Sequence, residues 1–194
     1  EITCRDWSSD VCSSDLNGMD EMRVGGEFEI DPKSFIGVVN KTEEQNSVFY
    51  ASGRIALKAI LKCLNLKNMN NIIHLPFYIC SSVVDTCIKS GYFTKFYELD
   101  ENFQFPIEYL ENIKSGELLL TVNYFGLVED NQLISEIKKH KPEIIIISDQ
   151  VQSFWTFDKS EADYSFTSLR KHFAIPDGAF VFTKKRSEIG RAHV

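Results

Sequence analysis

The central part of the chain alternates between short apolar runs and segments with helical spacing. From Arg54 to Leu64 the apolar residues recur at near-helical intervals, and Ser52 is a suitable N-cap, so a helix is predicted to begin at Gly53 or Arg54. The same pattern predicts strands at 71–76, 93–99, 118–126, 143–149, 162–168 and 179–183, and helices at 79–91, 105–114 and 131–140. This alternation predicts an α/β domain whose mainly parallel sheet is covered on both faces.

Both ends of the chain differ from this middle part. Residues 6–16 (DWSSDVCSSDL) are similar to a translated sequencing-library adaptor, and 189–194 (IGRAHV) to the same adaptor on the opposite strand. We therefore interpret 1–16 and 186–194 as non-native ends and 17–47 as an irregular or extended lead-in to the domain at 48–185. The alternative for 1–16 is a genuine Ser/Asp-rich disordered leader.

Composition narrows the function classes. The formal net charge of −7 argues against non-specific nucleic-acid binding, which needs a basic face. No apolar run reaches the length of a membrane span. Outside the suspect leader the cysteines are few and odd in number (Cys63, Cys80 and Cys87), which favours a reducing cytoplasm over a disulfide framework. We expect these three to be small buried hydrophobic residues without zinc-site spacing.

Three segments at predicted strand ends or helix starts could carry chemistry. In ASGR, Gly53 and Arg54 begin a helix, where free N–H groups can hold an anion, although taken alone the segment fits an ordinary capped helix better. In SDQVQ, Asp149 follows the isoleucine run, where a carboxylate needs a partner such as a pyridinium nitrogen or magnesium, or simply caps the next turn. In SLRKHF, Lys171 could be partly withdrawn from water and form a Schiff base, or it could be a solvated lysine.

Taken together, these segments resemble the DegT-type sugar aminotransferases, which have the type I fold of enzymes that use pyridoxal 5′-phosphate (PLP). The resemblance runs from Phe49 to Thr183. It is carried by YASGRIALKAIL, LPFYIC, GYFTKFYELD, VNYFG, SDQVQSF and SLRKHFAIPDGAFVFT. It implies the three-layer large domain of these enzymes, truncated before their C-terminal small domain.

The resemblance also implies roles for individual residues. Asp149 would pair with the pyridine nitrogen of PLP, and Gln152 would bond its phenolic oxygen. Lys171 would form the Schiff base and then shuttle a proton. The phosphate would be bound by Gly53, Arg54 and Ser168. Tyr78 would cover the ring, or else be a core aromatic residue.

Two positions depart from the family pattern. The usual serine five residues before the lysine would pair Ser165 with Arg170, so we assign the phosphate role to Ser168, three residues before Lys171. Some relatives carry histidine in place of the lysine and are sugar dehydratases. Here Lys171 stands beside His172, which favours transamination. His74 and His140 are interpreted as a strand residue and a helix-end residue.

The expected function is therefore PLP-dependent transfer of an amino group from an amino-acid donor to a nucleotide-linked keto-sugar. We expect a cytoplasmic homodimer when full length, and an inactive or poorly soluble protein from this chain alone. The alternatives are a PLP-dependent dehydratase or lyase, a non-catalytic regulator or scaffold with the same fold, and a metal- or nucleotide-binding domain with Asp149 as a magnesium ligand. The last lacks a Walker-type or Rossmann glycine pattern.

Overall fold

A computed structural model describes residues 47–65, 70–126, 130–155 and 160–184. The predicted non-native ends, and all of the lead-in except Ser47, lie outside these residues. The elements are β1 (Ser47–Tyr50), α1 (Gly53–Asn65), β2 (Ile72–Pro76), α2 (Ser81–Lys89), β3 (Phe93–Tyr97), η2 (Ile107–Asn112), β4 (Leu118–Val122), η3 (Tyr124–Gly126), α3 (Asp130–His140), β5 (Ile145–Asp149), β6 (Tyr164–Phe166), η5 (Leu169–Lys171) and β7 (Ala179–Thr183), where η marks a 3₁₀ helix.

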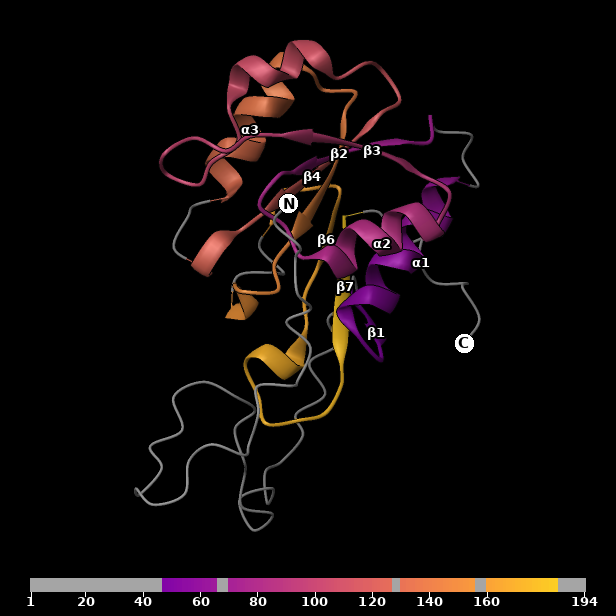
Figure 1. Cartoon of the computed structure of the whole chain (residues 1–194). Coiled ribbons are helices and arrows are strands. Elements are labelled where there is room, and N and C mark those ends of the chain that lie inside the picture. Colours follow the sequence, from indigo (N-terminus) through magenta and orange to yellow (C-terminus); the bar gives the residue numbers. More distant parts are fainter. Residues whose placement is uncertain (1–46, 66–69, 127–129, 156–159, 185–194) are drawn as a thin grey trace, which may run out of the picture.

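The strands form one seven-stranded sheet in the order β1-β7-β6-β5-β4-β2-β3. Strands β3, β2, β4, β5 and β6 are parallel neighbours, whereas β7 pairs antiparallel with both β6 and β1. Figure 1 shows α1 and α2 side by side and α3 apart from them. The predicted mainly parallel α/β sheet is confirmed.

Two hydrophobic clusters cover the two faces of this sheet. On one face the apolar side of α1 packs against β7, β1 and β6, in a cluster that also includes residues of β2 and β4; its buried residues are Ala56, Leu57, Ile60, Leu61 and Leu64. On the other face Ile134 and Ile137 of α3 pack with Leu119 and Ile146, which point to the opposite side of their strands. Burial on both faces explains why the isoleucine run reads as continuous rather than alternating.

Several element boundaries differ from the sequence predictions. Strand β1 was not predicted, because its partner β7 lies more than a hundred residues further along the chain and leaves no local pattern. The helix predicted at 105–114 is a 3₁₀ helix, held by bonds such as Ile113 N to Leu110 O. The strand predicted to reach residue 126 ends at Val122, where the backbone turns.

The structure also tests the expectations about the cysteines and about membrane spans. Cys87 is buried as expected, but Cys63 is half-buried and Cys80 is exposed at the start of α2, so the prediction was wrong for Cys80. None of the helices within the described ranges is long and apolar enough to cross a membrane.

Candidate active site

The loops after β4, β5 and β6 meet at one edge of the sheet. Asp149, the last residue of β5, lies in register with Val122 at the end of β4 and with Phe166 at the end of β6. Asn123 N donates to Asp149 O at 3.0 Å, and Gln150 N donates to Phe166 O at 2.8 Å. These contacts place the segments after the three strands side by side. This edge, beyond the carboxyl ends of parallel strands, is where ligands bind in open α/β sheets.

The carboxyl group of Asp149 is buried, and few hydrogen bonds offset the cost of burying it. Its side chain is 7% exposed, and its Oδ1 accepts one hydrogen bond, from Val151 N at 3.0 Å. Burial raises the pKa of Asp149 to about 7, although the Val151 N–H and the positive charge of Lys171 act in the opposite direction. A cationic group bound beside this carboxyl would favour its ionised form. Because the charge of Lys171 lowers the pKa of Asp149, the two residues lie close enough to interact electrostatically.

Gln152 lies on the loop that follows Asp149, and its side chain is exposed at this edge. Its Oε1 accepts a hydrogen bond from Phe125 N at 2.6 Å, which joins this loop to the turn after β4. Deeper in the loop, Asn123 Nδ2 donates to Gln150 Oε1 at 3.2 Å and to Ser153 Oγ at 2.9 Å. The loop is thus held along its length by the turn beside it.

The start of α1 lies against the end of β6. A Cβ atom added to Gly53 would be 3.6 Å from Ser168 Cβ and 3.7 Å from Thr167 O, both ordinary van der Waals contacts. Ser52 caps the helix as predicted, with its Oγ accepting from Ile55 N at 3.3 Å. Gly53 and Ser168 are therefore neighbours, as the proposed anion site requires. Arg54 is exposed.

Lys171 ends η5, the 3₁₀ helix that follows β6. Its backbone N–H donates to Ser168 O at 3.3 Å, and its side chain is exposed. The expectation of a lysine partly withdrawn from water was wrong for this structure, because none of the residues of η5 is buried. His172 follows, and its Nε2 lies 2.8 Å from Val151 O. Because a carbonyl only accepts, this nitrogen carries the proton.

An aromatic cluster flanks the same edge. Tyr78 lies 6.0 Å from Phe103 and 5.9 Å from Tyr124, measured between ring centroids, and the Tyr124 hydroxyl donates to Tyr78 O. Burial raises the pKa of Tyr124, and the nearby charge of Asp149 adds to this. Tyr78 itself is 64% exposed, so the alternative of a core aromatic residue was wrong.

The structure thus brings Asp149, Gln152, Gly53, Ser168 and Lys171 to one edge. Sequence reasoning missed Asn123, Tyr124 and Phe103 as neighbours of this site. The signal for the first two was their position in VNYFG directly after the buried strand β4, since ligands bind beyond the carboxyl ends of such strands. Within the described ranges, no three His, Cys, Asp or Glu side chains are grouped as metal ligands would be.

No protein-family model matches this chain, and no curated relative matches it. Solved structures do match. They include E. coli GDP-4-keto-6-deoxy-D-mannose-3-dehydratase with bound hydrated PLP, at 21% identity and a TM-score of 0.61 over 72% of this chain and 39% of that chain. The 3-amino-5-hydroxybenzoic acid synthase matches at 16% identity and 0.61, over 73% and 39%. An aminotransferase from Psychrobacter cryohalolentis matches at 15% identity and 0.60, over 72% and 38%.

These likenesses establish the fold of the chain. The seven-stranded α/β architecture is that of the matching part of the solved enzymes, as the resemblance in the sequence implied. The chain spans about two fifths of the length of the solved chains. The three neighbours named here are a dehydratase, a synthase and an aminotransferase.

Proposed function

We propose that this chain is the cofactor-binding part of a PLP-dependent aminotransferase. The observation that carries the proposal is the buried Asp149 carboxyl at the end of β5, lying within electrostatic reach of Lys171 and followed by Gln152 on the same loop. An isolated carboxyl buried there is costly unless a cationic ligand pairs with it. The pyridinium nitrogen of PLP is such a ligand.

The residues present at the edge fit PLP. Among the described residues, only the Val151 N–H bonds the Asp149 carboxylate, which leaves Oδ2 for a ring nitrogen. The glycine that begins α1 lets a phosphate approach the free N–H groups of that helix, with the Ser168 side chain beside it. Exposed Lys171 and Gln152 can both reach a ligand from solvent. The charge of Asp149, the N–H donors at the start of α1 and the exposure of Lys171 and Gln152 therefore all fit PLP.

Each residue has a separate task in this proposal. When bound, PLP supplies an electron sink for the substrate carbon. Asp149 holds the proton on the ring nitrogen, Gln152 donates to the phenolic oxygen, and Gly53, Arg54 and Ser168 bind the phosphate. Tyr78 would cover one face of the ring. Lys171 would hold the cofactor through Nζ, and the same amine would move a proton at the reacting carbon of the substrate.

The substrates we propose are an amino-acid donor and a keto-sugar linked to a nucleotide. The dehydratase among the structural neighbours is named for a GDP-linked keto-sugar, and a second solved form holds GDP-perosamine. We assign residues 48–185 to the cofactor-binding domain, and propose that the full-length enzyme is a homodimer in the cytoplasm. Within the part of the chain that the structure describes, Cys63, Cys80 and Cys87 form no disulfide, which is compatible with that reducing compartment.

A PLP-dependent dehydratase is the second candidate, and its support is the dehydratase fold neighbour. In this chain, however, His172 Nε2 is engaged with Val151 O, so its donor is already used by the protein. Lys171 is the group left exposed to act on a substrate. This arrangement favours amination over deoxygenation.

One experiment separates the two functions. The protein is expressed from its complete open reading frame, supplied with PLP, and offered an amino-acid donor and a nucleotide-linked keto-sugar. We expect an amino-sugar product together with the donor's keto acid, in equal amounts. A deoxygenated sugar without net transfer of nitrogen would support the dehydratase. If neither product forms, both candidate functions are contradicted.

A further inference from the structure

The turn after β4 has a backbone shape that disfavours side chains. Phe125 has φ 59° and Gly126 has φ 66°, so two consecutive residues occupy the left-handed region. A phenylalanine adopts this region only when its surroundings hold it there. The turn is therefore maintained by contacts, and those contacts indicate what it does.

The contacts of the turn converge on the loop that carries Gln152. Phe125 N donates to Gln152 Oε1 at 2.6 Å. A Cβ added to Gly126 would lie 2.8 Å from Gln152 O and 3.5 Å from Ser153 Cα, and the first distance is shorter than real Cβ contacts allow. Only glycine lets the two backbones approach this closely.

Aromatic rings hold the strained turn from the other side. The ring of Phe125 lies 5.7 Å from that of Phe103, at an interplanar angle of 85°. Phe103 has φ 59° as well, and among the described residues these two are the non-glycine residues with positive φ. Tyr124 contacts Phe103 and bonds the backbone of Tyr78. Two strained residues that support each other at a ligand-binding edge point to a functional constraint.

We propose that the Tyr124–Gly126 turn is a positioning element that fixes the orientation of the Gln152 side-chain amide. A backbone N–H can only donate, so Phe125 N must face the amide oxygen, and the amide nitrogen must face the other way. Gln152 then presents N–H donors, and no acceptor, to a ligand oxygen. This inference rests on the proposed function for the identity of that oxygen, the ionised phenolic oxygen of PLP.

The orientation predicts a measurable electrostatic effect. A donor beside the phenolic oxygen stabilises its ionised form, so the adduct of PLP with Lys171 releases its proton at a lower pH. If the donor is lost, the pKa of the adduct rises by about one unit, the size expected for one hydrogen bond to a charged group. This titration is followed by the visible absorbance of the protein and requires no turnover.

The test compares Gly126→Ala with Gly91→Ala in protein expressed from the complete open reading frame. Gly91 also has positive φ, at 86°, but a Cβ added there meets no atom within 4 Å, so it controls for backbone strain alone. We expect Gly126→Ala and Gln152→Glu each to raise the adduct pKa, and Gly91→Ala to leave it unchanged. The double variant should titrate no higher than Gln152→Glu alone, because both changes act through one amide.

A second measurement does not depend on the folding of Gly126→Ala. Amide hydrogen exchange at Phe125 should be about tenfold faster in Gln152→Ala, which lacks the acceptor, and should stay slow in Gln152→Glu, which keeps it. Equal exchange rates in all three proteins, or a Gly126→Ala variant that titrates like the wild type while Gln152→Glu is shifted, would overturn the positioning role. If the wild type forms no borohydride-reducible adduct at Lys171, the proposed function fails instead.

Discussion

His172 lies against the loop that follows β5, with its Nε2 donating to the backbone oxygen of Val151 at 2.8 Å. Its ring lies 5.7 Å from that of Phe154 on the same loop. The bond spans 21 positions in sequence and ties the segment that carries Lys171 to the loop that begins at Asp149. His172 therefore links two parts of the site.

Loss of the hydrogen bond between His172 and Val151 should make the site less rigid. We expect His172→Phe, which keeps a ring but loses the donor, to weaken PLP binding about tenfold, the value of one lost hydrogen bond. His172→Gln keeps an N–H donor and should lose less. Equilibrium dialysis against PLP measures both variants. Wild-type affinity in His172→Phe would show that the bond does not support the site.

Asp149 should make stability depend on pH in the absence of PLP. Its pKa is about 7 in the folded chain, because burial disfavours the charge, and near 3.8 in the unfolded chain. Between these values the folded state keeps the proton and the unfolded state has lost it. The free energy of unfolding contributed by Asp149 therefore falls as pH rises from about 4 to about 7, and changes no further above that.

Asp149→Asn should remove this dependence. At pH 8 the variant should be more stable than the wild type by at most about 4 kcal/mol, with the difference vanishing near pH 4. Urea unfolding at both pH values measures this, and other titrating groups cancel in the comparison. The same variant should bind PLP poorly, because it has no charge for the ring nitrogen. Parallel stability curves for the two proteins would contradict the buried, ionisable state of Asp149.

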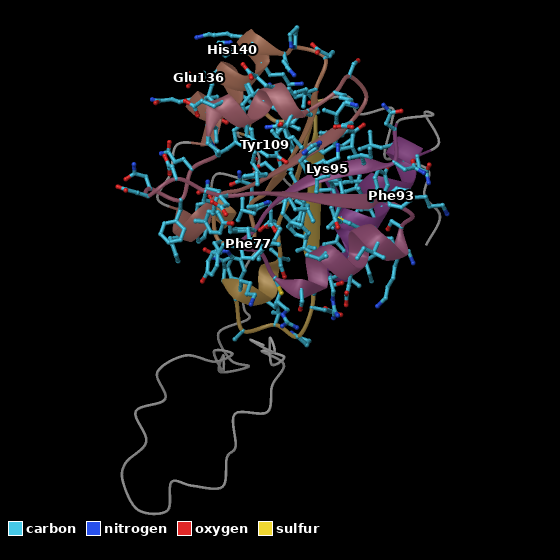
Figure 2. The ribbon with its side chains drawn as sticks, turned by 45° about the horizontal axis from the view of Figure 1, so that its top comes forward. Phe77, Phe93, Lys95, Tyr109, Glu136 and His140 are labelled. Atoms are coloured by element: carbon cyan, nitrogen blue, oxygen red, sulfur yellow. The ribbon has the colours of Figure 1, made fainter. Side chains whose placement is uncertain are left out.

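A charge network centred on the buried His74 and Glu117 lies on the sheet away from the site. His74 Nε2 is 2.7 Å from Glu117 Oε2, and Lys95 Nζ is 3.3 Å from Glu117 Oε1. Tyr109 bonds the other ring nitrogen of His74 at 3.1 Å. Figure 2 labels Lys95 and Tyr109 of this network. Burial favours a raised pKa for Glu117, but the bond from His74, the Lys114 N–H and Lys95 lower it overall.

Glu117→Ala should destabilise the fold by about 2–3 kcal/mol, because it leaves the fully buried His74 without one partner. The exposed Glu111→Ala is the matched control and should change little. Since the folded pKa of Glu117 is lowered, its contribution is present above the unfolded pKa and is lost as pH falls through the folded value. Urea unfolding measures the loss, and equal effects of the two variants would argue against the network.

Gly178 should be needed for the segment that carries Lys171. It has φ 114°, and a Cβ added there would lie 2.9 Å from Leu169 Cδ1, on the residue that begins η5. We expect Gly178→Ala to cost about 1–3 kcal/mol of stability and also to weaken PLP binding. Gly91→Ala should lower stability without affecting PLP. Unchanged PLP affinity in a folded Gly178→Ala protein would exclude this role.

Some residues of the candidate site leave a pattern in the local sequence, and others do not. Asp149 and Gly53 were predictable because a polar residue at the end of a buried strand, and a glycine at a helix start, leave local patterns. The left-handed Phe125 was not predictable, because phenylalanine disfavours that conformation and contacts with Phe103 and Gln152 impose it. The exposure of Lys171 depends likewise on η5, a single turn that no periodicity reveals.

Covalent attachment of PLP to Lys171 can be detected by mass spectrometry. Protein from the complete open reading frame is incubated with PLP, reduced with borohydride and digested. The masses of its peptides are then measured by mass spectrometry. We expect one phosphopyridoxyl group, located on Lys171 and absent from Lys171→Ala, while Lys95→Ala, a control at an exposed strand lysine, keeps it. A protein with no adduct, or with the adduct on another lysine, would show that Lys171 does not bind PLP.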